Sequence, residues 1–104
     1  MPKSETILLT GITGTAGSRL GAQMLRSGHK ILALMRDPTT DSARRRIDRV
    51  LAISDADTFA DSVEILRGDV CQPELGIDSD DCRLHEIGRI IHCAACVEFI
   101  ETTD

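Results

Sequence analysis

A cluster of glycines near the N-terminus has the spacing of a phosphate-binding turn. Residues 10–17 read T-G-x-x-G-x-x-G, directly after a short apolar run and before a helical pattern. In such a turn Gly11 allows a sharp change of direction, Gly14 lets the backbone approach a pyrophosphate, and Gly17 allows close helix packing. The helix start then offers free N–H groups and a positive dipole end to the phosphates. This strand–turn–helix context favours dinucleotide binding over a glycine-rich turn without a ligand. The predicted binding residues of the turn are Gly11, Thr13, Gly14, Thr15, Ala16 and Gly17.

Two arginines near this turn indicate which dinucleotide is bound. NAD-specific sites place Asp or Glu at the end of the second strand, where it binds the ribose 2′-hydroxyl. Here that position holds Met35, and Arg36 follows it. A guanidinium can hold a 2′-phosphate through charge-assisted hydrogen bonds, and Arg19 near the helix start is a second candidate. We therefore predict NADP(H) rather than NAD(H), although Asp37 beside Arg36 favours the opposite choice and a solvated Arg36 is the alternative.

The cysteines and histidines share some features of a metal site but do not form a consistent one. Cys93 and Cys96 have the C-x-x-C spacing of zinc ligands. However, Cys93 falls inside an apolar run that reads as a strand, and Cys71 and Cys82 lack such spacing. We therefore predict no metal site, and we expect His92 to have a structural role at a strand end.

The composition narrows the class of protein. Hydrophobic residues make up 41% of the 104 residues and charged residues 28%, with two Phe, no Trp and no Tyr, so the core must be aliphatic. The net charge of −5 argues against nucleic-acid binding, which requires a basic surface. The apolar runs are too short to cross a bilayer, and the N-terminus does not have the pattern of a signal peptide. Four cysteines in this setting predict reduced thiols and a cytoplasmic protein.

Apolar runs and helical patterns alternate along the chain. The apolar runs predict strands over residues 6–10, 30–35, 63–66 and 90–93. The helical patterns predict one helix over 15–27, ended by Gly28, and a second from Asp41 or Ser42 to about Ile53. Residues 55–61 read as a polar connection, 68–78 as a loop, and 79–87 as a short helix ended by Gly88. The arginines of the second helix, which read as its solvated side, are Arg44, Arg45, Arg46 and Arg49.

This alternation predicts an α/β fold with a parallel sheet and right-handed helical crossovers. The expected architecture is a partial Rossmann-like doubly wound sheet of about four strands in the order 3-2-1-4. In that order the fourth strand is an edge. Because an apolar edge strand is open to pairing with another chain, we expect the isolated chain to self-associate through it.

Three sequence elements together resemble extended short-chain dehydrogenases/reductases. They are the glycine turn, Gly68-Asp69-Val70 after the third strand, and residues 91–95, which read I-H-C-A-A. With P-E-L-G at residues 73–76 they resemble the thioester reductase and fatty acyl-CoA reductase branch, the "male sterility" type of NAD-binding domain. The resemblance implies that Asp69 and Val70 lie by the adenine. It also implies that the backbone of Cys93, Ala94 and Ala95 lines the nicotinamide ribose.

The resemblance covers nearly all of the chain and implies an NADP(H)-dependent oxidoreductase. Residues 1–104 would then be a single NAD(P)-binding Rossmann domain, the N-terminal part of a longer reductase domain. Its substrate would be an acyl group held as a thioester by CoA or an acyl carrier protein, reduced by hydride transfer.

The catalytic residues of that family have no counterpart in this sequence. The family uses a Tyr-x-x-x-Lys pair in which Tyr is the general acid. This chain has no Tyr, and its lysines are Lys3 and Lys30. We therefore predict no catalytic residue here and expect the chain alone to be inactive. Two alternatives are a non-catalytic NADP(H)-binding regulatory module and a relative of NAD-dependent epimerases and dehydratases.

Overall fold

Strands and helices alternate along the chain, as the sequence predicts. The computed structural model describes residues 5–93. The strands are β1 (Thr6–Thr10), β2 (Lys30–Met35), β3 (Val63–Arg67) and β4 (Ile87–His92). The helices are α1 (Thr15–Arg26) and α2 (Thr40–Ile53). Three short 3₁₀ helices complete the described chain: η1 (Asp57–Ser62), η2 (Pro73–Gly76) and η3 (Cys82–Glu86).

The four strands form one parallel sheet in the order β3-β2-β1-β4, which confirms the predicted topology. In the register of this sheet Leu8 of β1 lies between Leu32 of β2 and Ile90 of β4. Because all strands run the same way, their carboxyl ends meet at one edge of the sheet. The glycine turn and Arg36 therefore emerge at the same edge, where doubly wound sheets bind their ligands.

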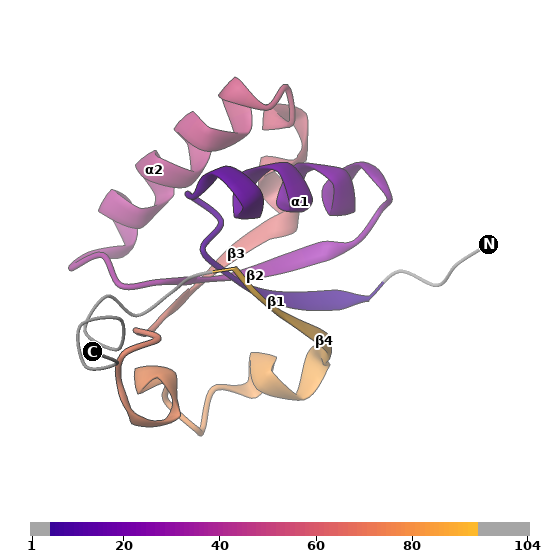
Figure 1. Cartoon of the computed structure of the whole chain (residues 1–104). Coiled ribbons are helices and arrows are strands. Elements are labelled where there is room, and N and C mark those ends of the chain that lie inside the picture. Colours follow the sequence, from indigo (N-terminus) through magenta and orange to yellow (C-terminus); the bar gives the residue numbers. More distant parts are fainter. Residues whose placement is uncertain (1–4, 94–104) are drawn as a thin grey trace, which may run out of the picture.

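The two faces of the sheet are covered differently. Figure 1 shows α1 and α2 packed on one face, with the segment between β3 and β4 on the other. On the helical face Leu9, Ile31 and Ile47 belong to the larger apolar cluster and are at most 1% exposed. The opposite face carries a smaller cluster, in which the partly buried Leu75 and Leu84 pack against Leu8 and its neighbours. Both faces of the central strands are thus apolar, which explains their continuous apolar runs.

The ends of the two helices follow the chemistry of capping. Gly28 has a φ of +92°, and the N–H groups of Gly28 and His29 donate to Leu25 O and Met24 O, a Schellman motif. The predicted C-terminal glycine of α1 is thereby confirmed. At the start of α2 the cap is Thr39, whose Oγ1 accepts from the backbone N–H of Ser42 at 3.1 Å. The prediction of Asp41 or Ser42 as the cap was wrong by two to three positions.

The segment between β3 and β4 differs most from the prediction. The helix expected over residues 79–87 is only the 3₁₀ turn η3, and β4 begins at Ile87, so Gly88 lies inside a strand. Asp81 caps η3 by accepting from the N–H of Arg83. The partly buried Leu84 and Ile87 pack on the sheet, so the chain follows the sheet surface instead of continuing a helix.

The turn η2 holds consecutive residues in the left-handed region. Glu74 has a φ of +53°, Leu75 +61° and Gly76 +62°. For an L-residue this conformation costs about 1–2 kcal/mol, whereas glycine there costs only its extra chain entropy of about 0.5–1 kcal/mol. We therefore expect Glu74→Gly to raise the free energy of unfolding by about 0.5–1 kcal/mol in urea titrations.

A matched control for this prediction is Glu86→Gly. Glu86 is also exposed and lies in a 3₁₀ turn, but its φ is negative. This second substitution should lower stability. Equal changes in the same direction for both variants would contradict the assignment of strain to Glu74.

Candidate dinucleotide-binding site

The turn between β1 and α1 is built around a left-handed glycine and a buried isoleucine. Gly11 has a φ of +79°, which favours glycine, and its carbonyl accepts the N–H of Gly14 at 3.0 Å. Ile12 is 1% exposed and belongs to the larger apolar cluster. Because Ile12 anchors the middle of the turn in the core, residues 13–16 are held at the surface in a fixed position.

The start of α1 is arranged to receive an anion. Its N-cap is the exposed Gly14, which brings no capping side chain, and the first turn of the helix holds no acidic residue. Thr15 and Ala16 are exposed beside it, so the predicted turn residues are brought together. The first N–H groups of a helix lack helical acceptors, and the dipole there favours negative charge. The residues present therefore fit a pyrophosphate held by backbone N–H groups.

Arg19 lies next to this turn. A groove of about 640 Å³ is lined by Thr13, Gly14 and Thr15 of the turn and by Arg19 and other residues of α1 and the end of α2. Arg19 is exposed, so its guanidinium is accessible from this groove.

Arg36 and Asp69 both line a second hollow, beyond the carboxyl ends of β2 and β3. This hollow of about 360 Å³ is lined by Arg36, Arg67, Asp69, Gly76 and their neighbours. Arg36 is exposed there. The structure therefore brings together the residues predicted for the 2′-phosphate and for the adenine, at the same edge of the sheet as the glycine turn.

The acidic residue beside Arg36 is neutralised by contacts that the sequence interpretation missed. Asp37 is only 7% exposed. Its Oδ1 accepts from Arg46 Nη1 at 2.8 Å and its Oδ2 accepts from Ser42 Oγ at 3.0 Å. Arg46 Nη2 also donates to Thr13 Oγ1 at 3.3 Å. Arg46 thus joins the glycine turn to the end of β2.

Two of the arginines in α2 contact neighbouring elements, although Arg46 is exposed as predicted and Arg44 is partly exposed. Arg46 contacts Asp37 and Thr13, and Arg44 donates to backbone carbonyls outside its helix. Arg45 and Arg49 are exposed, as predicted. Arg67, which was not singled out, donates to the carbonyls of Asp37 and Pro38 and so holds the chain after β2 beside the end of β3. The acidic Asp37 was the one available signal for Arg46, since a carboxylate is the usual partner of an arginine side chain.

Asp69 shapes the loop that follows β3. Its Oδ1 accepts from the N–H of Cys71 at 2.9 Å, and its own N–H donates to Leu75 O at 2.7 Å. Val70 is partly buried against the smaller apolar cluster. Asp69 therefore lines the second hollow with its carboxylate held in a local turn, while Val70 faces the core.

The end of β4 is tied to the start of the glycine turn. The N–H of Cys93 donates to both the carbonyl and the Oγ1 of Thr10, each at 3.1 Å. Thr10 Oγ1 and His92 Nδ1 are hydrogen-bonded at 2.8 Å, which gives His92 the structural role expected of it. Cys93 thus lies beside the predicted site, whereas Ala94 and Ala95 lie outside the described residues.

Two of the cysteines, Cys82 and Cys93, are free, as expected. Within residues 5–93 no group of three or more His, Cys, Asp or Glu side chains is placed to hold a metal ion. In the same range no helix is long and apolar enough to cross a membrane.

Comparisons with known proteins agree on one family. A family model described as "Male sterility protein" matches residues 9–104. The isonitrile lipopeptide synthase of Mycobacterium tuberculosis is 32% identical over 87 residues, which cover 74% of this chain and 4% of that protein. Fatty acyl-CoA reductase 1 of Gallus gallus is 30% identical over 112 residues, covering 96% of this chain and 22% of that protein. The chain thus spans only a small part of these relatives.

Solved structures give the same fold. The terminal R domain from the myxalamid PKS-NRPS biosynthetic pathway has a TM-score of 0.79 and 31% identity, covering 91% of this chain and 25% of that one. The PhqB reductase domain from Penicillium fellutanum also has a TM-score of 0.79, with 24% identity over 95% of this chain and 29% of that one. With the glycine turn and the parallel sheet described above, these matches show that the chain belongs to the male sterility protein family, as a Rossmann-like NAD(P)-binding domain related to thioester reductases.

Proposed function

We propose that this chain binds NADP(H) and is the cofactor-binding part of a reductase that acts on acyl thioesters. The observation that carries the proposal is the pairing of an uncapped, acid-free helix start at Gly14 with the hollow that contains Arg36. The turn would hold the pyrophosphate through its N–H groups, and Arg36 would hold the 2′-phosphate. Arg19, which borders the turn, would add positive charge to the approach.

The contacts of Asp37 support NADP(H) over NAD(H). An acidic residue selects NAD when its carboxylate is free to accept from the ribose hydroxyls. Here both carboxylate oxygens already accept protein hydrogen bonds, and Arg46 balances the charge. Asp37 would therefore repel a 2′-phosphate only weakly, while the exposed Arg36 and the bridging Arg46 attract it.

A calorimetric titration with NADP⁺ and, separately, NAD⁺ tests this proposal. We expect NADP⁺ to bind more tightly than NAD⁺. Arg36→Gln should weaken NADP⁺ binding about tenfold or more and leave NAD⁺ binding unchanged, because the substitution removes one charge-assisted contact to the 2′-phosphate.

The matched control is Arg45→Gln, which removes the same charge from an exposed position of α2. It should change neither affinity. No binding of either dinucleotide to the wild-type chain would refute the proposed function. Equal weakening of both dinucleotides by Arg36→Gln would refute the role of Arg36 in selecting the phosphate.

The acyl thioester part of the proposal is supported by the names of the relatives. They include a fatty acyl-CoA reductase and proteins of PKS-NRPS assembly lines, so the substrate of the longer protein would be a thioester on CoA or an acyl carrier protein. NADPH supplies a hydride when bound. The chain contains no tyrosine, so we propose that a Tyr-Lys pair from a further segment supplies the proton.

The same binding site would also serve a second candidate function, a non-catalytic module that binds NADP(H) and responds to its redox state. Such a module would capture a protein partner with only one of NADP⁺ and NADPH bound, whereas the cofactor part of a reductase would not discriminate in this way. For either function we propose a cytoplasmic location and self-association through β4.

A further inference from the structure

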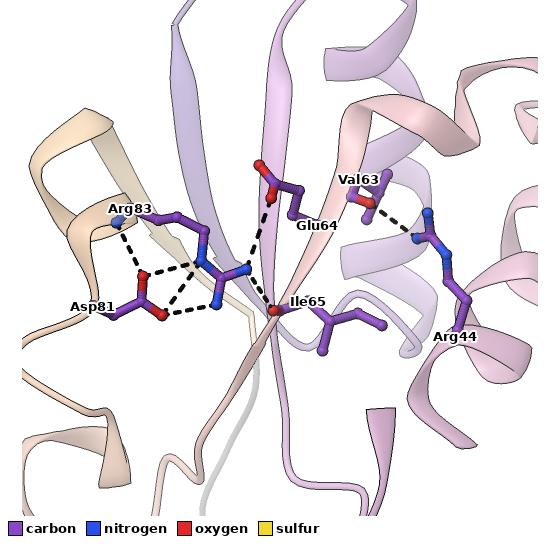
Figure 2. Close-up of polar contacts among 6 residues, drawn as sticks. All are labelled: Arg44, Val63, Glu64, Ile65, Asp81 and Arg83. Carbon is purple, nitrogen blue, oxygen red and sulfur yellow. Dashed lines mark hydrogen bonds and ion pairs between the residues drawn. The ribbon is translucent and has the colours of Figure 1, made fainter. Parts of the chain in front are cut away.

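The two edge strands of the sheet differ in whether side chains occupy their outer backbone groups. β3 forms one edge and β4 the other. On β3 the carbonyl of Val63 accepts from Arg44 Nη1, and the carbonyl of Ile65 accepts from Arg83 Nη1, both at 2.9 Å. Figure 2 shows these two guanidinium groups reaching the same strand. Residues 63 and 65 are two positions apart, so their carbonyls point to the same side of the strand. The arginines therefore occupy successive acceptors on the outer edge of β3.

The two arginines come from opposite faces of the sheet. Arg44 belongs to α2, on the helical face, and Arg83 belongs to η3, on the other face (Figure 1). Arg44 Nη2 also donates to Ala60 O at 3.0 Å, and the N–H of Val63 donates to the same carbonyl. At Val63 both the donor and the acceptor of the edge are thus satisfied within the chain.

Acidic neighbours hold Arg83 in place. Asp81 accepts from Nε and Nη2 of Arg83 at 3.0 and 2.8 Å, and Glu64 lies 3.8 Å from Nη1 (Figure 2). The hydrogen bonds from Arg83 lower the pKa of Asp81 to about 2, and Asp81 in turn raises the pKa of Arg83. Both groups therefore stay charged at neutral pH. The contacts with Asp81 and Glu64 hold the guanidinium of Arg83 in position to donate to β3.

The opposite edge has no comparable protection in the part of the chain that the structure describes. Within residues 5–93, β4 pairs with β1 and with no other strand. Its Ile90 side chain is 64% exposed. An unprotected apolar edge accepts further strands, whereas charged groups placed over an edge prevent addition.

We propose that Arg44 and Arg83 form an edge cap that prevents a second copy of this chain from adding to β3. With one capped edge, pairing of copies through β4 closes after two chains. With β3 uncovered, β4 of one copy could pair with β3 of the next, and this head-to-tail contact would repeat without closing.

Sedimentation velocity over a range of concentrations tests the cap with the whole chain. The wild type should reach no species larger than a dimer. The double variant Arg44→Ala with Arg83→Ala should give a sedimentation coefficient that keeps rising with concentration. The control, Arg45→Ala with Arg49→Ala, removes the same positive charge from exposed positions of α2 and should behave as the wild type.

Circular dichroism establishes which variants are folded before they are compared. A folded double variant that sediments like the wild type would overturn the proposal, as would continued growth of the charge-matched control. If the double variant does not fold, the single variants Arg44→Ala and Arg83→Ala decide the matter. At least one of them must form species larger than the wild type does, and unchanged sedimentation of both would overturn the proposal.

Discussion

Replacing Gly17 by alanine should destabilise the protein by about 3 kcal/mol and abolish dinucleotide binding. A Cβ at this position would lie 1.9 Å from Gly11 O and 2.6 Å from Gly11 C. These are backbone atoms of the turn, so no side-chain rotation relieves the overlap. The start of α1 would have to move away from the turn, and its N–H groups would no longer be placed to bind the phosphates of the proposed cofactor. Urea denaturation and calorimetric titration with NADP⁺ would measure the two effects.

Gly14→Ala separates binding from stability. Its Cβ would lie 3.4 Å from Gly11 O, an ordinary contact, and the φ of −83° suits any residue. This variant should keep nearly the wild-type free energy of unfolding but bind the dinucleotide more weakly, because the added methyl group lies where a pyrophosphate approaches the backbone. A Gly17 variant as stable as the Gly14 variant would contradict the close contact between helix and turn.

Gly68→Ala should have the second largest effect, a loss of about 2–3 kcal/mol in the free energy of unfolding. The new Cβ would lie 2.4 Å from Leu75 O and 2.6 Å from Leu34 Cδ1. The carbonyl of Leu75 also accepts the N–H of Asp69, so the overlap would separate the loop after β3 from the turn η2. We expect faster hydrogen exchange across residues 68–77 and weaker NADP⁺ binding, because Asp69 and Gly76 line the hollow that contains Arg36.

Gly88→Ala is the appropriate comparison for this substitution. The atoms nearest its Cβ would belong to the side chain of Glu5, with Oε2 at 3.0 Å and Cβ at 3.3 Å, so a small shift of that side chain is enough. The free energy of unfolding should change little, and hydrogen exchange over residues 68–77 should stay as in the wild type. If Gly68→Ala leaves exchange in that segment unchanged, the glycine is not required for the close approach of the two turns.

The parts of the fold that local chemistry determines could be predicted from the sequence. The apolar runs gave the central strands, and Gly28 correctly marked the end of α1. The start of α2 was harder, because Thr39, Asp41 and Ser42 can all act as caps and local sequence does not rank them. The η2–η3 segment was harder still, because its conformation depends on contacts with β3 that are distant in sequence, such as Arg83 with Ile65 O.

In the site, too, the features that depend on local sequence were predictable and those that depend on distant contacts were not. The glycine turn was predictable because each of its steps is local. Arg46 was not, because helical periodicity identifies a face that points away from the core but does not show which side chains on it reach a neighbouring element. Here Arg46 reaches back to Asp37 and across to Thr13. The choice of NADP(H) over NAD(H) stays a prediction.

The hydroxyl of Thr10 has a consequence for the order in which the site can form. Thr10 meets His92 and Cys93, which lie 82 and 83 positions later in the chain. The glycine turn itself is closed by a hydrogen bond between neighbouring residues, from the N–H of Gly14 to the carbonyl of Gly11. Closing a long loop costs entropy before its contacts repay it, so such distant pairings form late in folding. During synthesis the glycine turn can therefore form early, whereas the contacts of Thr10 with His92 and Cys93 form only after β4 has been made.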